Sequence, residues 1–254
     1  MGILEGKAVM ITGAASGIGE ATAKEAAVEG ARILLCDIDA EKGAAVAASI
    51  GDAATYRDCD VTDEAAVEAA VAATVAAYGR IDCAFNCAGI LGVVGNIGEL
   101  PLDGWKQLIE VDLNGVFLCT KHQVNAMAEQ GSGAILNMAS AAGLIGWPGA
   151  SGYVAAKHGV VGLSKAAALE YAEQGIRVNA ICPSYTITPM VEKDLFEDTL
   201  GNDEVLIAAA RANHPIGRFA QPEEIAAAAT WLLSDKASFV TGTAMPVDGG
   251  YCAP

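Results

Sequence analysis

Residues 8–19 read Ala8-Val9-Met10-Ile11-Thr12-Gly13-Ala14-Ala15-Ser16-Gly17-Ile18-Gly19, an apolar run followed by a glycine-rich segment. The run predicts a buried strand, and the glycines predict a tight turn that opens a helix. In such a turn the backbone N–H groups and the helix N-terminus can approach a pyrophosphate. The spacing is Gly-xxx-Gly-x-Gly, which differs from the common Gly-x-Gly-xx-Gly pattern of dinucleotide-binding proteins. The segment therefore predicts a nucleotide-binding turn, with a purely structural turn as the alternative.

Apolar runs rich in Val, Ile and Leu alternate with Ala- and Glu-rich stretches along the whole chain. We expect strands at 8–12, 32–36, 55–59, 81–86, 134–138, 177–181 and 239–247. We expect helices at 21–30, 40–49, 63–78 (capped by Thr62) and 105–130, a helix that carries Tyr153 and Lys157 and continues to about residue 173, and further helical pieces at 189–215. This alternation predicts an α/β protein whose parallel sheet carries helices on both faces. No linker or repeat divides the chain, so residues 1–254 are predicted to form one domain.

The charge and the cysteines exclude several classes of protein. The formal charge of −16 over 254 residues argues against binding to nucleic acids or to anionic membrane surfaces. The seven cysteines form no CxxC pair, and they fit small core residues in a reducing cytosol better than metal ligands. Glu5 and Lys7 interrupt the first apolar stretch, so we expect no signal peptide and a cytoplasmic protein.

Acidic and small residues follow three of the expected strands. Asp37 ends the second strand, where a carboxylate can accept both ribose hydroxyls and would repel the 2′-phosphate of NADP. Asp60 and Val61 follow the third strand and could hold the adenine. Residues 86–89 follow the fourth strand, at the edge of the sheet where open α/β sheets bind ligands. These positions predict NAD in preference to NADP, although a strand-end aspartate can also be merely solvated.

Tyr153 and Lys157 are spaced Tyr-Val-Ala-Ala-Lys, and Ser140 lies just upstream. Residues four apart share one face of a helix, so the phenol and the ammonium can approach one site together. A cation beside a phenol lowers the phenol pKa from about 10, which makes Tyr153 a candidate proton exchanger for an alcohol or ketone. A pair on an ordinary surface helix is the alternative.

Taken together, these motifs make the chain similar to the short-chain dehydrogenase/reductase family along nearly its full length. The matching segments are Thr12 to Gly19, Asp60-Val61, Asn86 to Gly89, Asn114, Ser140, Tyr153-xxx-Lys157 and Asp248-Gly249-Gly250. The resemblance implies a Rossmann-type doubly wound sheet, a nicotinamide cofactor and frequently a homotetramer.

The resemblance also implies roles for individual residues. Tyr153 is the expected general acid/base, and Ser140 the expected hydrogen-bond partner of the substrate oxygen. Lys157 is expected to lower the Tyr153 pKa and bind the nicotinamide ribose, and Asn114 to anchor a water-linked proton relay to Lys157. The expected cofactor-binding residues are Gly13, Ser16, Gly17, Ile18, Gly19, Asp37, Asp60, Val61, Asn86, Ala88, Gly89, Tyr153, Lys157, Pro183, Thr186 and Thr188.

The chain departs from the family pattern at two positions. Cys87 stands where the family usually has a second Asn, and Ser184 follows Pro183 where the family usually has Gly. We expect the cofactor contact at 86–89 to survive. Ser184 lacks the freedom of glycine at positive φ, so the cofactor affinity or the pocket shape can differ there.

The expected substrate-binding residues are Ser140, Ile145, Trp147, Tyr153 and Tyr185, with Leu91, Val93, Val94 and Leu144 around them and residues 189–215 as a cover. Because this set contains no Arg or Lys, it predicts a neutral, cyclic or steroid-like secondary alcohol or its ketone. Two alternatives stay open: an NADP-dependent carbonyl reductase and a non-catalytic, dinucleotide-binding regulatory protein. The C-terminal residues from Tyr251 could lie in a subunit interface.

Overall fold

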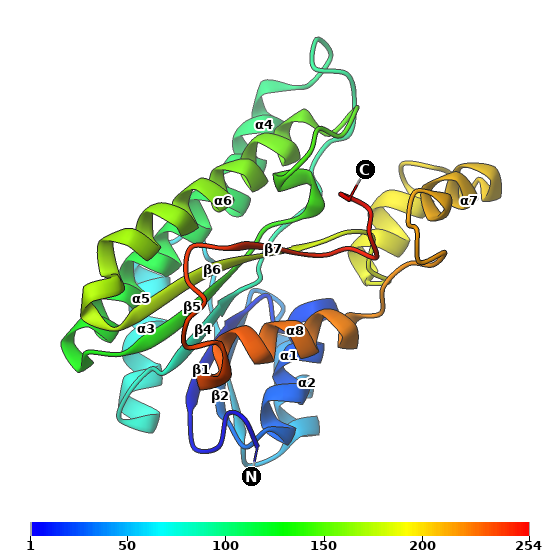
Figure 1. Ribbon diagram of the computed structural model, residues 1–254. Helices are drawn as coiled ribbons and strands as arrows, with labels where there is room; N and C mark the ends of the chain where they lie inside the picture. The colour runs from blue at the N-terminus through cyan, green and yellow to red at the C-terminus, as the bar shows by residue number, and fades with distance from the viewer. Residues whose placement is uncertain (1, 254) are drawn as a thin grey trace.

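A parallel sheet of seven strands runs through the centre of the computed structural model, which describes residues 2–253 (Figure 1). The strands are β1 (Ala8–Thr12), β2 (Arg32–Asp37), β3 (Ala54–Asp58), β4 (Cys83–Asn86), β5 (Gly133–Met138), β6 (Ile176–Pro183) and β7 (Ala244–Val247). Their order across the sheet is β3-β2-β1-β4-β5-β6-β7, and every neighbouring pair is parallel. The direction of winding reverses between β1 and β4, which is where open α/β sheets bind their ligands.

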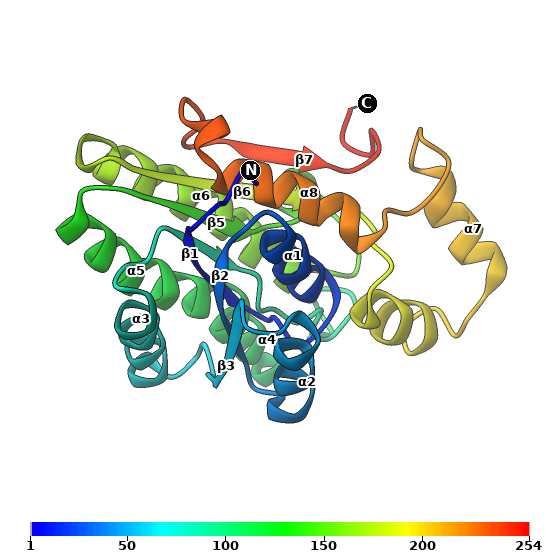
Figure 2. The same cartoon turned by 90° about the horizontal axis from the view of Figure 1, so that it is seen from below.

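Six helices cover the two faces of the sheet (Figure 2). One face carries α1 (Gly17–Val28), α2 (Ala40–Ile50) and α8 (Pro222–Leu233), and the other carries α3 (Glu64–Tyr78), α5 (Gly115–Gln130) and α6 (Ser151–Tyr171). The predicted fold class, a doubly wound Rossmann-type sheet, is therefore confirmed. Two separate cores follow from it, one on each face, because alternate side chains of every strand point to opposite faces.

Small residues let the helices approach the sheet and one another closely. All five residues of β1 are buried, as expected for a central strand of a parallel sheet. On one face, Ala23 and Ala26 of α1 are fully buried against α8, where Ala229 is also fully buried. The Ala-rich composition of the chain thus reflects its close helix packing.

The N-cap of α3 is one residue later than the sequence suggests. The Asp63 carboxylate accepts hydrogen bonds from the N–H groups of Ala65 (2.9 Å) and Ala66 (3.4 Å). Thr62, the predicted cap, instead bonds through its N–H (2.9 Å) and hydroxyl (2.8 Å) to Asp60. Asp63, and not Thr62, caps the helix because its carboxylate can accept hydrogen bonds from two free N–H groups of the first turn at once.

The predicted helix 105–130 is longer and is interrupted. It begins as α4 (Leu102–Ile109), widens into the π-helical segment η1 (Glu110–Asn114) and continues as α5. The N–H of Gly115 bonds to the carbonyl of Glu110, five residues back, which marks the π turn. Such a turn shifts the face on which the following side chains lie, and hydrophobic periodicity did not reveal it.

Two further expectations about the C-terminal third are wrong or incomplete. The predicted strand 239–247 shortens to β7, and Phe239 is fully exposed. Helix α8 was not predicted, although Pro222 at its first turn and a capping box between Gln221 and Glu224 are start signals. The remaining elements are α7 (Glu204–Ala212), the π-helical η4 (Met190–Glu197), and the 3₁₀ turns η2 (Ala141–Gly143), η3 (Ala172–Gln174) and η5 (Asp235–Ala237).

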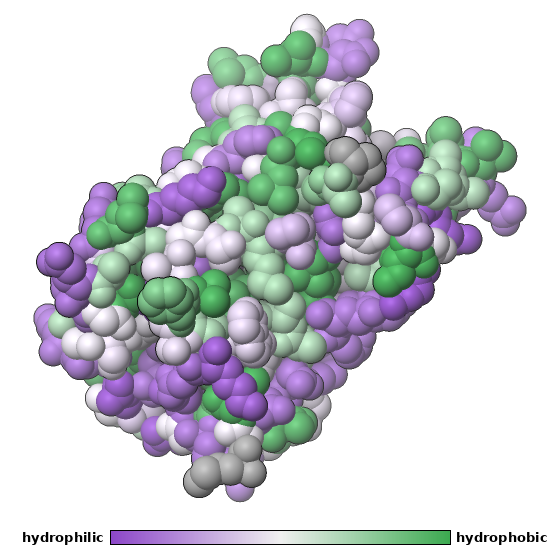
Figure 3. Space-filling model, viewed as in Figure 1, coloured by the Kyte–Doolittle hydropathy of each residue, from purple (hydrophilic) through white to green (hydrophobic). Residues whose placement is uncertain are grey.

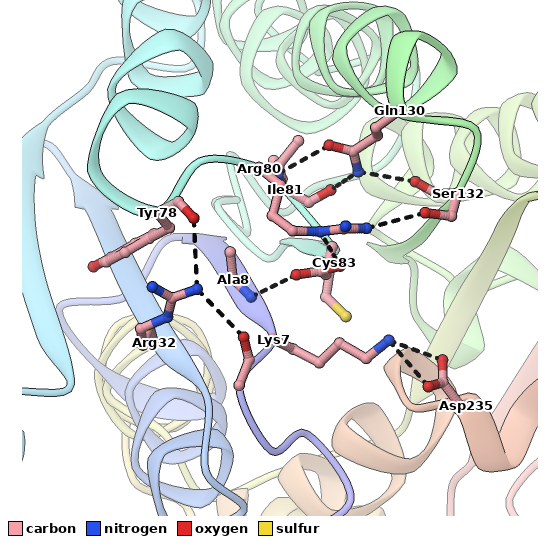
Figure 4. Close-up of polar contacts among 12 residues, drawn as sticks. Lys7, Ala8, Arg32, Tyr78, Arg80, Ile81, Cys83, Gln130, Ser132 and Asp235 are labelled. Carbon is pink, nitrogen blue, oxygen red and sulfur yellow. Dashed lines mark hydrogen bonds and ion pairs between the residues drawn. The ribbon is translucent and has the colours of Figure 1, made fainter.

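Polar contacts close the edge of the sheet at which β1, β4 and β5 begin (Figure 4). The Asp82 carboxylate accepts from the N–H of Ala8 (2.9 Å) and from Arg80 (2.6 Å). The Gln130 amide bonds the backbone of Ile81 and Ser132 and so ties α5 to this edge. The hydrogen-bond donors and acceptors at this edge pair with one another, so we expect these contacts to stabilise the fold.

The surface seen in Figure 3 mixes hydrophilic and hydrophobic residues, without one dominant apolar patch. Among residues 2–253, no helix combines the length and the apolar character needed to cross a membrane.

Candidate active site

The glycine-rich turn lies at the carboxyl end of β1, as predicted. Gly13 has φ +65°, and a Cβ there would lie 2.7 Å from the backbone of Ala88 in the β4 loop. A Cβ on Gly19 would collide with the carbonyl oxygen of Gly13. The Thr12 hydroxyl accepts from the N–H groups of Cys87 (3.1 Å) and Ala88 (3.3 Å), which fixes the β4 loop against the turn. Only glycine allows the backbone to fold this closely here.

Asp37 joins the glycine-rich turn to the end of β2. One carboxylate oxygen accepts from the Ala15 N–H at 2.9 Å, and the other accepts from the Asp39 N–H at 3.0 Å. Each oxygen retains a lone pair, so the carboxylate can accept further hydrogen bonds from the cavity side. The first cation after Asp37 along the chain, Lys42, pairs with Asp39 at 2.7 Å.

A cavity of about 620 Å³ extends from this turn along the carboxyl ends of the strands. Its walls include fifteen of the sixteen expected cofactor-binding residues, namely Gly13, Ser16, Gly17, Ile18, Gly19, Asp37, Asp60, Val61, Ala88, Gly89, Tyr153, Lys157, Pro183, Thr186 and Thr188. The backbone space that the glycines keep free, and the N-terminus of α1 that opens into the cavity, fit the pyrophosphate of a dinucleotide.

Asn86, the sixteenth residue, does not line the cavity. Its side chain is 1 % exposed, and its amide N–H groups donate to Gln123 (2.9 Å) and Asn137 (2.9 Å) beneath the strand ends. The expectation of a direct cofactor contact from this side chain is therefore corrected to a structural role. An amide at the end of a buried strand satisfies itself within the sheet when neighbouring strands also carry amides.

Tyr153, Lys157 and Ser140 meet at one end of the cavity. Tyr153 and Lys157 lie one turn apart on α6, with the Lys157 ammonium 5.3 Å from the centre of the Tyr153 ring. Ser140 precedes η2, where its hydroxyl accepts from the Ala142 N–H at 3.1 Å, and it lines the cavity together with Tyr153 and Lys157. The sequence expectation that these three side chains converge agrees with this geometry.

Asn114 lies apart from this cluster. Its side chain is exposed and donates to Glu110 at 2.7 Å. Asp112, two residues earlier, is completely buried, and its carboxylate lies 3.0 Å from the Lys157 ammonium. The expectation that Asn114 acts on Lys157 is therefore corrected: the π turn directs Asp112 inward and Asn114 outward. The sequence of this polar helical stretch does not reveal which side chain is buried, because the π turn that decides it cannot be recognised from the sequence.

The three ionisable groups of the cluster, Tyr153, Lys157 and Asp112, shift one another's pKa values. Burial raises the pKa of the Tyr153 hydroxyl, the Lys157 charge lowers it and the Asp112 charge raises it, with a net upward direction. Burial lowers the pKa of Lys157, but the charges of Asp112 and Tyr153 raise it and prevail. Burial also raises the pKa of Asp112, against the lowering effect of Lys157. The free protein therefore holds Tyr153 in its neutral form.

An apolar pocket opens beside the cluster, and it shares five residues with the larger cavity: Ser140, Tyr153, Ser184, Met190 and Val191. Its walls are Leu91, Ser140, Ala141, Ala142, Ile145, Trp147, Tyr153, Ser184, Tyr185, Met190, Val191, Leu195 and Tyr251. All five expected substrate-binding residues are among them, and so are three residues of the predicted cover 189–215. No side chain in this lining carries a formal charge at neutral pH.

Three residues that we expected around the pocket do not line it. Val93, Val94 and Leu144 are absent from its lining, and Val93 is 49 % exposed. Tyr251 takes part instead, although the sequence suggested a subunit interface for it. Its ring lies 6.0 Å from the ring of Tyr185. The sequence did not predict this contact, because it forms only when the C-terminal chain returns beside β6.

Ser184, one of the two departures from the family pattern, does not strain the backbone. Among residues 2–253 the only non-glycine residue with positive φ is Asn202. The Ser184 hydroxyl donates to the Asp248 carbonyl (3.1 Å) and lies 3.0 Å from Nε2 of His214. Ser184 thus connects the loop after β6 with the cover and the C-terminal segment.

Cys87, the second departure, lines the larger cavity with its neighbours Ala88 and Gly89. Its backbone N–H still bonds to Thr12, so the loop geometry does not require an Asn side chain. Burial raises the pKa of the Cys87 thiol to about 12, which keeps it neutral.

Comparisons with known proteins agree with this geometry. The family model described as enoyl-(acyl carrier protein) reductase matches residues 13–252. The 2,5-dichloro-2,5-cyclohexadiene-1,4-diol dehydrogenase of Sphingobium indicum is 45 % identical over 254 residues, which cover 100 % of both chains. The cyclohexanol dehydrogenase of an Acinetobacter species is 45 % identical over 248 residues, which cover 96 % of this chain and 94 % of that one.

A solved structure is also similar to this one. The crystal structure of 3-ketoacyl-(acyl-carrier-protein) reductase from Brucella melitensis complexed with NADH has a TM-score of 0.90 and 36 % identity, with 98 % of this chain and 99 % of that chain covered. Fold, cavity, side-chain cluster and relatives lead to one conclusion. The chain belongs to the short-chain dehydrogenase/reductase family, oxidoreductases that use a nicotinamide dinucleotide.

Proposed function

We propose that this protein is an NAD-dependent dehydrogenase that interconverts a neutral, cyclic secondary alcohol and its ketone. The observation that carries the proposal is the position of Tyr153 and Ser140, which form part of both the dinucleotide cavity and the uncharged pocket. A substrate oxygen placed between these two hydroxyls lies next to the nicotinamide end of the cavity. This is the geometry that hydride transfer to or from a carbinol carbon requires.

In the proposed oxidation, the Tyr153 phenolate accepts the proton of the substrate hydroxyl. The Ser140 hydroxyl donates a hydrogen bond to the substrate oxygen as its negative charge develops. Lys157 stabilises the phenolate electrostatically and is placed to bind a ribose hydroxyl. A bound nicotinamide dinucleotide supplies the hydride acceptor or donor. Because the pKa of Tyr153 is raised in the free protein, oxidation should accelerate with rising pH, and reduction, which uses the neutral phenol, should not.

Asp37 supports NAD in preference to NADP. Its carboxylate lines the cavity at the end of β2, where the adenosine ribose of a dinucleotide lies in this fold. Within residues 2–253, Lys157 is the only Lys or Arg in the cavity wall, and it belongs to the opposite end. A 2′-phosphate at Asp37 would therefore meet a negative charge with no cation to offset it, which disfavours an NADP-dependent carbonyl reductase.

The pocket and the relatives support a neutral cyclic substrate. Trp147 packs edge to face against Tyr153 and Tyr185, with ring centres 6.3 and 5.6 Å apart. These rings give the pocket an apolar lining that suits the C–H surface of an alicyclic ring. Two relatives at 45 % identity are named for cyclic alcohols, a cyclohexadiene diol and cyclohexanol. A steroid-like alcohol is the larger member of the same substrate class.

The proposed assembly is a homotetramer in the cytoplasm. Phe117 on α5 and Leu169 on α6 are 47 % and 84 % exposed, and Phe239 before β7 is fully exposed. Exposed large apolar residues on the outer helices and beside the last strand suit subunit contacts. Sedimentation velocity of the purified protein tests the proposal, and a purely monomeric species would contradict it.

The direct test is a substrate panel assayed with NAD and with NADP. Neutral cyclic alcohols, matched cyclic alcohols with a carboxylate, and linear alcohols would be compared by the absorbance of the reduced nicotinamide. We expect the highest kcat/KM with NAD and the neutral cyclic compounds. Turnover of the carboxylated alcohols alone would contradict the substrate class, and cofactor binding without any turnover would favour a non-catalytic regulatory protein.

A further inference from the structure

We propose that His214 is a positioning residue for the substrate pocket: through the Ser184 hydroxyl it holds Tyr185 and Tyr251 in the pocket wall and so sets the affinity for the alcohol. The inference rests on the proposed function, because affinity for the alcohol is its kinetic readout. His214 does not belong to the pocket lining, but its ring packs against both tyrosines, which do.

Both nitrogens of the buried His214 ring have a partner. The residue follows α7 near the end of the cover and is 2 % exposed. Nδ1 lies 3.1 Å from the carbonyl oxygen of Ala210, one turn earlier, and Nε2 lies 3.0 Å from the hydroxyl of Ser184 in the loop after β6. A carbonyl oxygen only accepts, so Nδ1 carries a hydrogen. The two contacts therefore fix both the place and the orientation of the ring.

The Ser184 hydroxyl extends this contact to the C-terminal segment. It lies 3.1 Å from the carbonyl oxygen of Asp248 as well as 3.0 Å from Nε2 of His214. A hydroxyl has one hydrogen and two lone pairs, so it can bond both neighbours. Tyr185 directly follows Ser184, and Tyr251 follows Asp248 by three residues. The hydrogen bonds of Ser184 thus join the cover to the two chain segments that carry the pocket tyrosines.

The His214 ring also contacts the pocket wall by aromatic packing. Its centre lies 5.5 Å from the ring centre of Tyr185 and 5.0 Å from that of Tyr251. A third ring, Phe219, lies 5.5 Å away. Of these four rings, only the two tyrosines line the pocket. His214 therefore supports the wall from behind, and a displacement of its ring would change the shape of the wall.

Space filling alone does not explain a histidine at this place. A buried polar ring is unfavourable unless its nitrogens find partners, whereas a phenylalanine fills a similar volume without that requirement. The cover is also held to the C-terminal segment without the imidazole, because the Ile216 N–H donates to the Gly249 carbonyl at 3.2 Å. We therefore expect variants of His214 to fold, and the distinctive contribution of the imidazole to be its hydrogen bonds.

The groups proposed for hydride transfer are held by other contacts. Tyr153 and Lys157 belong to α6, and Ser140 follows β5. Within residues 2–253, no hydrogen bond joins any of the three to His214. Loss of the imidazole should therefore weaken binding of the alcohol and leave turnover of the bound complex nearly unchanged.

The test compares His214→Phe, which keeps a ring without nitrogens, with His214→Gln, which keeps a hydrogen-bonding group without a ring. For a neutral cyclic alcohol at saturating NAD, we expect His214→Phe to raise KM about fivefold, with kcat within about twofold of the wild type. His214→Gln should raise KM less, because its amide can bond Ser184. It should nevertheless have the lower melting temperature, because it loses the aromatic packing. Opposite orders in KM and in melting temperature separate positioning from packing.

A second pair of variants tests the connection through Ser184. If His214 and Ser184 act through one hydrogen bond, Ser184→Ala combined with His214→Phe should have a KM close to that of His214→Phe alone. His158→Phe on α6 is the matched control. Its Nδ1 also lies against the carbonyl four residues earlier, that of Val154 (2.9 Å), but the side chain is exposed. The KM of this control should equal that of the wild type.

Crystal structures of the variants without substrate give a readout that is independent of the proposed function. We expect the ring of Tyr185 or Tyr251 to be displaced in His214→Phe and in Ser184→Ala, and to keep its native place in His214→Gln. If the wild-type protein oxidises no cyclic alcohol, the proposed function is wrong, and these structures still decide whether His214 positions the wall.

Three results would overturn the proposal. The first is a wild-type KM in His214→Phe, or an equal rise of KM in His158→Phe. The second is a His214→Phe protein that is closer to the wild type than His214→Gln in both KM and melting temperature, since the ring alone would then matter. The third is a double variant in which the separate effects on KM multiply. If His214→Phe does not fold, a wild-type KM in Ser184→Ala has the same meaning as the first result.

Discussion

The cofactor side and the substrate side of the site are built in different ways. Most of the cofactor side consists of short motifs that follow β1, β2, β3 and β4, and each motif occupies neighbouring residues. Tyr153 and Lys157 of α6 and the loop after β6 complete it. The substrate side combines the segment after η2, the loop after β6, the cover with η4 and the C-terminal Tyr251. A local motif defines its own backbone geometry, whereas a wall assembled from distant segments depends on how the whole chain packs. The predictions below test whether the two sides respond separately.

The largest effect is expected where the two sides meet. Tyr153→Phe removes the proposed acid/base group while the ring and its packing against Trp147 remain. We expect kcat to fall by about 10³-fold, within the range that general acid–base catalysis contributes. NAD affinity, measured by quenching of protein fluorescence, should change by less than about tenfold, since the loss of one hydrogen bond is modest. A comparable loss of NAD binding would mean that Tyr153 acts mainly on the cofactor.

A large effect confined to the cofactor side is expected for Gly19→Ala. The new Cβ would collide with the carbonyl of Gly13, so the turn must shift. Overpacking of this kind costs about 1–3 kcal/mol, and if this cost falls on the bound state, NAD affinity drops about 5- to 150-fold. Gly98→Ala is the matched control, because a Cβ at Gly98 meets no atom within 4 Å. Equal affinities for NAD in the two variants would contradict the close approach at the turn.

A smaller effect on the same side is expected for Asp37→Ser. Removal of the carboxylate should lower the preference for NAD over NADP by about tenfold, or ~1.4 kcal/mol. The ratio of kcat/KM values for the two cofactors, measured with one alcohol, reports this change. The relative activities on different alcohols should stay constant, since Asp37 is absent from the pocket lining. Asp52→Ser, an exposed change on the surface, is the control.

The smallest effect is expected for Ser184→Gly, at a residue that lines both the pocket and the larger cavity. The substitution removes the hydroxyl that contacts the Asp248 carbonyl and His214, and each such hydrogen bond contributes about 1 kcal/mol. We expect KM for the alcohol to rise a few fold, with NAD affinity nearly unchanged. A larger change in NAD affinity than in KM would show that Ser184 belongs functionally to the cofactor side.

The fold and the cofactor side could be predicted well from the sequence. The alternation of apolar runs with Ala-rich stretches indicated the parallel sheet, and fifteen of sixteen expected cofactor-binding residues line one cavity. The exception, Asn86, satisfies its amide within the sheet, which depends on the amides of neighbouring strands. Outer parts of the substrate pocket were predicted less well: Val93 and Leu144 lie outside the lining, and Tyr251 lies inside it.

The sheet, the glycine-rich turn and the Tyr153–Lys157 pair follow from the sequence alone, because strand burial, glycine conformation and helical spacing act over a few residues. That Asp112, and not Asn114, lies against Lys157 is a property of the folded chain. The two residues are equally polar and only two positions apart, and a π turn distinguishes their directions. That turn is stabilised by contacts with the β4 loop and α6, which the chain brings together only when it has folded.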